Sequence, residues 1–246
     1  MTGSRTVAIL LAGGSATRLG SNENKVYLEL AGRPMLAWSL DAFERSPLVD
    51  DVVLVVRDTD RERATAIAAA VPARKVSLIV DGGDTRHESE RAGLEAIADE
   101  IASGRVGLVA IHDGARPFIR QALLERILGA AAEVGGAVPA MPVDSEFLLR
   151  VDPSGASELV DAATLKGMQT PQAFRAAELL AAYRAAEVAD FHGVDTAESV
   201  ERFSDLVVAT VDGDADNMKV TFVEDLILAE KRAATWGEAP GGPAAG

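Results

Sequence analysis

Glycines and basic side chains occur together in short polar segments of this 246-residue sequence. In the first such segment, Gly13 and Gly14 are followed by Arg18 and Lys25. Glycine lets backbone N–H groups approach phosphate oxygens closely, and Arg and Lys supply positive charge to the same oxygens. The spacing matches neither the P-loop nor the dinucleotide-binding pattern. The segment therefore indicates a phosphate-binding loop, with a tight turn carrying two solvated cations as the alternative.

A second glycine-rich segment suits the rest of a nucleotide. Gly82, Gly83 and Ser89 present small groups and a hydroxyl, which fits contact with a base or a ribose. The alternative is a helix cap made by Asp84 or Thr85, since Asp and Thr are favoured at that position. From this segment alone the cap is the better-supported interpretation.

Two segments later in the chain carry charge. Asp113 follows an apolar run and precedes a glycine, which suits a Mg²⁺ ligand, and Arg116 could hold a second phosphate. Asn217, Lys219 and Thr221 alternate, so an extended backbone places them on one face. The alternatives are a structural Asp–Arg pair and an ordinary strand edge with a solvated Lys.

Apolar runs alternate with helix-length segments through most of the chain. The runs are apolar at successive positions, which is typical of parallel strands buried on both faces. We therefore predict an α/β fold with a doubly wound, mostly parallel sheet. The expected strands are Thr6–Leu11, Asp51–Arg57, Val76–Val80, Val106–His112, Gly136–Met141 and Leu206–Val211. The expected helices are Pro34–Arg45, Arg61–Val71, Arg86–Ala102, Arg120–Glu133, Ala173–Ala186 and Val223–Trp236.

This sheet would gather the polar segments. Ligands bind at the carboxyl ends of strands in such folds, and the loops after Leu11, Val80 and His112 lie at that edge. Residues 1–236 are expected to form a single domain, with a projecting β-arm at about 144–164. The Gly-, Pro- and Ala-rich tail 237–246 is expected to be disordered.

Composition excludes several classes of function. The chain has no cysteine, so disulfides, thiolate metal sites and cysteine nucleophiles are excluded. The net charge of −14 disfavours binding to nucleic acid, and a nucleotide would need local basic contacts. No apolar stretch is long enough to span a membrane, and we expect a cytoplasmic protein.

The three histidines do not point to a metal or a base. His87 and His192 lie in polar segments and are expected to be exposed. His112 ends a buried strand and is expected to be a hydrogen-bonded structural residue. No set of His, Asp and Glu has the spacing of a zinc site.

Taken together, the motifs resemble one enzyme family. The specific pieces are His112–Pro117, Gln169–Phe174 and Asp216–Thr221, the last followed by Glu224-Asp225-Leu226. In this order they resemble the 2-C-methyl-D-erythritol 4-phosphate cytidylyltransferases and the related ribitol-5-phosphate cytidylyltransferases. The resemblance spans about Thr6 to Glu230 and implies a Rossmann-like fold, a projecting arm and a homodimer.

The resemblance also implies a reaction and roles for residues. CTP and 2-C-methyl-D-erythritol 4-phosphate would give the CDP-alcohol and pyrophosphate, with Mg²⁺ as cofactor, in isoprenoid precursor synthesis. The catalytic residues would be Arg18, Lys25 and Lys219. The CTP-binding residues would be Ala12, Gly13, Gly14, Gly82, Gly83, Ser89 and Asp113. Asp113 would bind the metal, and Asp113, Arg116 and Thr221 would bind the acceptor.

The sequence departs from the family pattern at three positions. Ala16 replaces a usual glycine, Glu146 is an unusual acid, and Ala162 stands where the family has an arginine on the arm. Lys166 could substitute for that arginine. The acceptor therefore stays open between methylerythritol phosphate, ribitol 5-phosphate and another polyol phosphate. Two other functions also stay open: a catalytically weak nucleotide-binding regulatory protein, and a sugar-1-phosphate nucleotidyltransferase that uses another nucleoside triphosphate.

Overall fold

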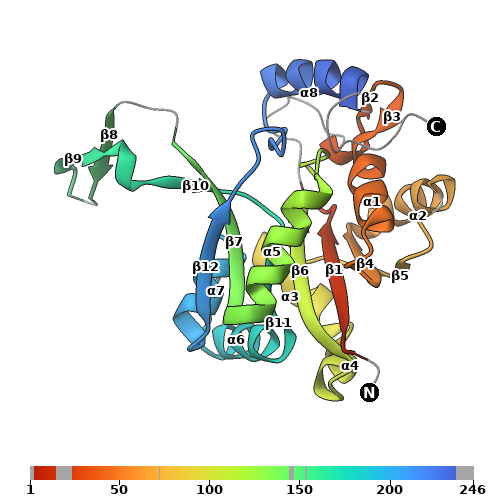
Figure 1. Cartoon of the computed structure of the whole chain (residues 1–246), viewed down its shortest axis with the longest axis horizontal. Coiled ribbons are helices and arrows are strands. Elements are labelled where there is room, and N and C mark those ends of the chain that lie inside the picture. Colours follow the sequence, from red (N-terminus) through yellow and green to blue (C-terminus); the bar gives the residue numbers. More distant parts are fainter. Residues whose placement is uncertain (1–2, 15–23, 72, 144–146, 153, 237–246) are drawn as a thin grey trace.

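A mixed sheet forms the centre of the molecule in the computed structural model, which describes residues 3–14, 24–71, 73–143, 147–152 and 154–236 (Figure 1). Within these residues, eight strands join one sheet in the order β10-β7-β11-β6-β1-β4-β5, and β12 also pairs with β7. The strands are β1 (Arg5–Leu11), β4 (Asp51–Val56), β5 (Val76–Asp81), β6 (Val106–Asp113), β7 (Gly135–Pro142), β10 (Lys166–Met168), β11 (Gln172–Arg175) and β12 (Val207–Asp212). Two small hairpins lie outside it: β2 (Glu29–Leu30) with β3 (Arg33–Pro34), and β8 (Phe147–Val151) with β9 (Ser157–Asp161).

The strands that carry the polar loops run in one direction. β1 pairs in parallel with β4 on one side and β6 on the other, and β4 pairs in parallel with β5. β10 and β11 run antiparallel to β7. The predicted mostly parallel α/β sheet is confirmed, and the carboxyl ends of β1, β4, β5 and β6 meet at one edge.

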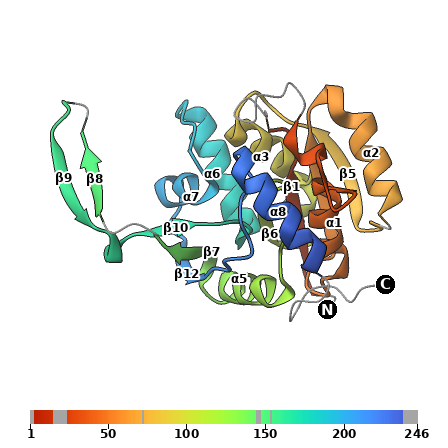
Figure 2. The same ribbon diagram turned by 90° about the horizontal axis from the view of Figure 1, so that it is seen from above.

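Helices cover both faces of the sheet (Figures 1 and 2). The helices on one face are α1 (Met35–Arg45), α2 (Arg61–Ala70) and α5 (Gln121–Val134), and α8 (Val223–Thr235) packs against β2 beyond the carboxyl ends of the strands (Figure 1). Those on the other are α3 (Arg86–Glu95), α4 (Ala98–Ala102), α6 (Ala176–Val188) and α7 (Thr196–Phe203). None of the helices in the described ranges is long and apolar enough to cross a bilayer.

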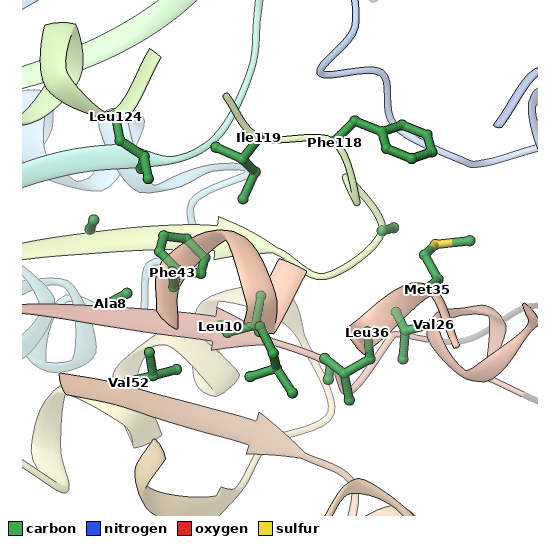
Figure 3. Packing of buried hydrophobic residues seen from close by; sticks show 14 of the residues in the cluster. Ala8, Leu10, Val26, Met35, Leu36, Phe43, Val52, Phe118, Ile119 and Leu124 are labelled. Atoms are coloured by element: carbon green, nitrogen blue, oxygen red, sulfur yellow. The ribbon is translucent and has the colours of Figure 1, made fainter. Parts of the chain in front are cut away.

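The two-sided cover explains the continuous apolar runs. Along β1, Ala8 and Leu10 pack into the cluster under α1 and α5, where Figure 3 shows Leu10 beside Leu36 and Phe43. Val7 and Ile9 point to the opposite cluster under α3 and α6. Because successive side chains of a strand face opposite ways, burial on both faces requires apolar residues at every position.

Two predicted elements differ from the structure, and several observed elements were not predicted. The single helix expected over Arg86–Ala102 is two helices, α3 and α4, separated at Ala96 and Ile97. The helix expected from Ala173 begins at Ala176, because Gln172–Arg175 forms strand β11 between β6 and β7. Helix α7 and strands β2, β3, β10 and β11 were not predicted. For β10 and β11, pairing with the distant strands β7 and β6 outweighs the local pattern.

The hairpin of β8 and β9 lies to one side of the sheet in both views (Figures 1 and 2). Its strands pair only with each other among the described residues, with Leu149 opposite Leu159. Leu149 and Leu159 are 62% and 65% exposed. Glu146 and the tail 237–246, for which disorder was predicted, lie outside the described residues.

Helix α3 approaches β1 and β4 closely at Gly93, which gives a stability prediction. A Cβ at this position would lie 2.7 Å from Ile9 Cγ2 and 3.1 Å from Val55 Cγ2. We expect Gly93→Ala to lower the free energy of unfolding by about 1–3 kcal/mol, because α3 must move off the sheet. Urea unfolding followed by circular dichroism measures this change.

Gly129→Ala is the matched control. Gly129 lies inside α5, and a Cβ there meets nothing within 4 Å. This variant should gain about 0.5–1 kcal/mol from helix propensity. Equal stability of the Gly93→Ala variant and the wild type would contradict the close packing of α3.

Candidate active site

A cleft of about 680 Å³ opens where β1, β4, β5 and β6 end. Each strand contributes its following loop, as the topology of a parallel sheet requires. The residues that line the cleft are Leu11, Gly13, Gly14, Lys25, Val26, Arg57, Asp58, Thr59, Gly82, Gly83, Asp84, Thr85, Arg86, Ser89, Asp113, Gly114, Ala115 and Lys219. Four of these side chains are basic and three are acidic, so the lining carries a slight positive charge although the protein carries a net charge of −14.

The wall that carries Lys25 is fixed by a buried asparagine. Asn24 is 3% exposed, and its Nδ2 donates to the carbonyl of Ala12 at 2.6 Å. Its Oδ1 accepts from Val26 N at 3.3 Å and caps the short 3₁₀ helix Lys25–Tyr27. Lys25 is thereby placed beside the end of β1. Ala12 itself is fully buried and its N–H donates to Val55 O, so it lies behind the cleft lining.

The opposite wall is the start of α3. Thr85 caps this helix: its Oγ1 accepts from Glu88 N, and its own N–H donates to the Glu88 carboxylate. The predicted cap is therefore present, and it lies within the cleft lining. A Cβ on Gly82 would lie 2.7 Å from Ser89 Oγ, and one on Gly83 would lie 2.3 Å from Glu88 Cβ. Only glycine lets the loop pass this closely over the amino end of α3, which favours anions.

Asp113 is the most strongly paired group in the cleft. Its Oδ2 accepts from Lys219 Nζ at 2.7 Å, and its Oδ1 lies 3.3 Å from Arg86 Nη2. Burial alone would raise the pKa of the Asp113 carboxyl, but the charges of Arg86, Lys219 and Arg116 outweigh burial and hold that pKa well below its usual range. Asp113 is therefore an anion throughout the neutral pH range.

The loop that brings Lys219 is tied to the same corner. Arg116 Nη1 donates to the carbonyl of Asn217 at 2.8 Å. Asn217 is fully buried, and its Nδ2 donates to the carbonyl of Thr170 at 2.8 Å. The guanidinium of Arg116 and the side chain of Thr221 are not part of the cleft lining, although both lie in segments that reach it.

The histidines differ from one another in environment. His112 is fully buried; its Nε2 lies 3.0 Å from Arg116 O and its Nδ1 lies 3.1 Å from Thr170 Oγ1. It therefore holds the loop after β6 in place, as predicted. The expectation that His87 is exposed is wrong: it is 3% exposed and stacks on Tyr183 at 4.6 Å. His192 is half-exposed, as expected.

The donor set limits the kind of metal that fits. Within the described ranges, no three His, Asp or Glu side chains are grouped so as to hold a metal ion. Mg²⁺, however, is usually held by one or two carboxylates together with substrate phosphates and water. The ionised Asp113 at the floor of a basic cleft fits this mode, in which the nucleotide itself completes the coordination.

The structure brings most of the predicted residues together. Those that share the cleft are Lys25, Gly13, Gly14, Gly82, Gly83, Ser89, Asp113 and Lys219. Arg18 and Ala16 lie outside the described residues. The sequence interpretation missed Arg57 and Arg86 as lining residues. Arg57 directly follows β4, so it could have been predicted from the rule that ligands bind at the carboxyl ends of parallel strands. Arg86 is identified only by its ion pair with Asp113.

Comparisons with known proteins agree on one family. Residues 6–233 match the family model described as 2-C-methyl-D-erythritol 4-phosphate cytidylyltransferase. An enzyme of that name from Cereibacter sphaeroides is 41% identical over 231 residues, covering 93% of this chain and 97% of the relative. One from Geobacillus kaustophilus is 38% identical over 223 residues, covering 91% and 94%. The crystal structure of 4-diphosphocytidyl-2C-methyl-D-erythritol synthase from Anaerococcus prevotii superposes with a TM-score of 0.80 at 26% identity, covering 94% and 96%.

Buried His112 gives the site a pH-dependent stability. Burial lowers the pKa of His112 from 6.5 to about 4 in the folded protein. Between these values the unfolded chain binds more protons, so stability is present above pH 6.5 and is lost as the pH falls towards 4. We expect a loss of up to about 3 kcal/mol across this window from His112.

Urea unfolding of the wild type and of His112→Gln at several pH values tests this assignment. Glutamine can still donate to Arg116 O but does not titrate, so the variant should lose less stability over the same window. Parallel pH profiles for the two proteins would show that His112 does not carry the effect.

Proposed function

The chain belongs to the 2-C-methyl-D-erythritol 4-phosphate cytidylyltransferase family, and on this premise we propose that it transfers the cytidylyl group of CTP to 2-C-methyl-D-erythritol 4-phosphate. A phosphate oxygen of the acceptor forms a bond to the α-phosphorus of CTP. The bond from that phosphorus to the bridging oxygen breaks, and pyrophosphate leaves. The products are the CDP-alcohol and pyrophosphate. The observation that carries this proposal is the cleft that joins Lys25, Arg86 and Lys219 to Asp113 at the edge of the sheet.

The reaction does not need a general base. A phosphate monoester has a second pKa of about 6, so the attacking group is mostly a dianion near neutral pH. The buried His112, which is hydrogen-bonded to the Arg116 carbonyl, therefore needs no catalytic role in this reaction. The difficulty is electrostatic: two polyanions must approach, and charge develops on the α-phosphoryl group.

The cleft residues divide this electrostatic work. Gly13 and Gly14 offer backbone N–H groups to the CTP phosphates, and Gly82, Gly83 and Ser89 face the cytidine. Lys25, with Arg18 from outside the described residues, stabilises the developing charge. Mg²⁺, held by Asp113, would neutralise phosphate oxygens and orient them for displacement. Lys219 and Arg116, with Thr221 nearby, receive the acceptor.

The proposal extends to the assembly and its location. We place the acceptor phosphate near the hairpin of β8 and β9 from a second copy in a homodimer. The exposed Leu149 and Leu159 of this hairpin support such a contact. Ala162 offers the phosphate no charge, and Lys166 is the nearby cation on β10.

The absence of cysteine fits a reducing compartment, and we place the reaction in the cytoplasm.

A pyrophosphate-release assay with CTP and Mg²⁺ tests the proposed reaction. Methylerythritol phosphate should give faster release than ribitol 5-phosphate, and CTP faster release than UTP, GTP or ATP. Tight CTP binding without release from any acceptor would favour a regulatory binding protein instead.

Removal of Mg²⁺ with EDTA should stop the release of pyrophosphate, and Mg²⁺ in excess should restore it.

Lys25→Ala tests the electrostatic mechanism. We expect kcat to fall by at least about a hundredfold, because a positioned charge at the transition state is lost. The fold should persist, since Asn24 fixes this loop by its bond to the Ala12 carbonyl. Lys231→Ala, on the exposed side of α8, is the matched control and should keep wild-type activity. Near-normal turnover by Lys25→Ala would refute the role of this lysine.

A further inference from the structure

A second carboxylate lies close behind the cleft without lining it. Glu90 is on α3, one turn after Arg86, and is 1% exposed. Removing a charge from water costs several kcal/mol unless partners replace the lost solvation. Three groups do so: Arg86 Nε donates to Oε1 at 2.9 Å, Thr196 Oγ1 donates to Oε1 at 2.8 Å, and Tyr183 OH donates to Oε2.

These partners fix Glu90 from outside the cleft. Thr196 begins α7 and Tyr183 lies on α6, two helices that contribute no residue to the cleft lining, so the carboxylate is held from outside the cleft. Burial raises the pKa of Glu90, and the charge of Arg86 opposes that rise. Arg86 Nε–H can only donate and both hydroxyls are placed to donate, which matches an ionised acceptor.

Arg86 links this buried carboxylate to the floor of the cleft. Its Nε is bonded to Glu90, while its Nη2 lies 3.3 Å from Asp113 Oδ1. In the described part of the chain, these two carboxylates are its ion-pair partners. The positive charge of Arg86 is therefore shared between them. If Glu90 were uncharged, the attraction of Arg86 would fall on Asp113 alone.

We propose that Glu90 is a positioning residue that holds the Arg86 guanidinium to the cleft wall and so leaves the Asp113 carboxylate available to a divalent cation. The inference rests on the proposed function, in which Asp113 binds the metal of the nucleotide complex. Glu90 touches neither substrate nor metal, and it acts only through Arg86.

Binding of Mn²⁺ to the whole enzyme in the presence of CTP tests this role without turnover. Free Mn²⁺ is counted by electron paramagnetic resonance. Glu90→Gln keeps the shape of the side chain and removes its charge, and we expect the dissociation constant for Mn²⁺ to rise roughly tenfold. Tyr183→Phe removes one donor but keeps both charges, and its affinity for Mn²⁺ should stay near that of the wild type.

The double variant Arg86→Gln/Glu90→Gln separates positioning from general damage. Removing both charges leaves no stranded buried ion, which proteins often tolerate. If Arg86 competes for Asp113 once Glu90 is neutral, the double variant should regain most of the Mn²⁺ affinity lost in Glu90→Gln. Mn²⁺ binding in the double variant as weak as in the single variant would overturn the proposal. If Glu90→Gln alone does not fold, the double variant is compared with the wild type, and a much weaker affinity for Mn²⁺ than that of the wild type would overturn the proposal.

Asp113→Asn distinguishes failure of this inference from failure of the proposed function. Mn²⁺ binding by Asp113→Asn equal to that of the wild type would refute the metal role of Asp113, and the inference with it. Loss of binding in Asp113→Asn together with unchanged binding in Glu90→Gln would refute only the role of Glu90. A melting curve for each variant ensures that folded proteins are compared.

Discussion

The carboxylate of Asp113 must stay ionised while it is nearly buried, and much of the site follows from this requirement. Burial disfavours the charge, so cations must be brought to it from elsewhere in the chain. Arg86 comes from the start of α3, and Lys219 lies 106 residues after Asp113 in the chain. Lys25 and Arg57 also line the cleft and supply the local positive charge that binding of a triphosphate would require in a protein of net charge −14.

The central fold is predictable from sequence because a strand that is buried on both faces must be apolar at successive positions. Val52 to Val56 are all buried, and the strand was predicted from that run alone. Gln172–Arg175 shows where this reasoning ends. The segment leads into an Ala-rich stretch with good helix propensity, yet antiparallel pairing with β6 and β7 makes it a strand. No local pattern marks a residue whose partners lie tens of positions away.

The site was predictable to the extent that its residues sit at strand ends. Gly13 and Gly82 follow β1 and β5, and Asp113 is the last residue of β6, so topology alone brings them together. Glu90 could not be found this way, because a glutamate within a helix is normally solvated. Its partners Tyr183 and Thr196 lie 93 and 106 residues further along the chain, and only tertiary packing reveals that the carboxylate is buried. His87 was misjudged for the same reason.

The glycines over the start of α3 also bear on how such an enzyme can diverge. Positions 82 and 83 have no room for a side chain, since an added Cβ would lie 2.7 Å from Ser89 Oγ or 2.3 Å from Glu88 Cβ. Under the proposal that these glycines face the base, the choice of base cannot be adjusted by small steps at the loop itself. A change in nucleotide preference must come from neighbours that already project side chains into the cleft, such as Thr59, Asp84 and Thr85. The tightest part of the wall is thus its least adaptable part, and variation is left to the side chains beside it.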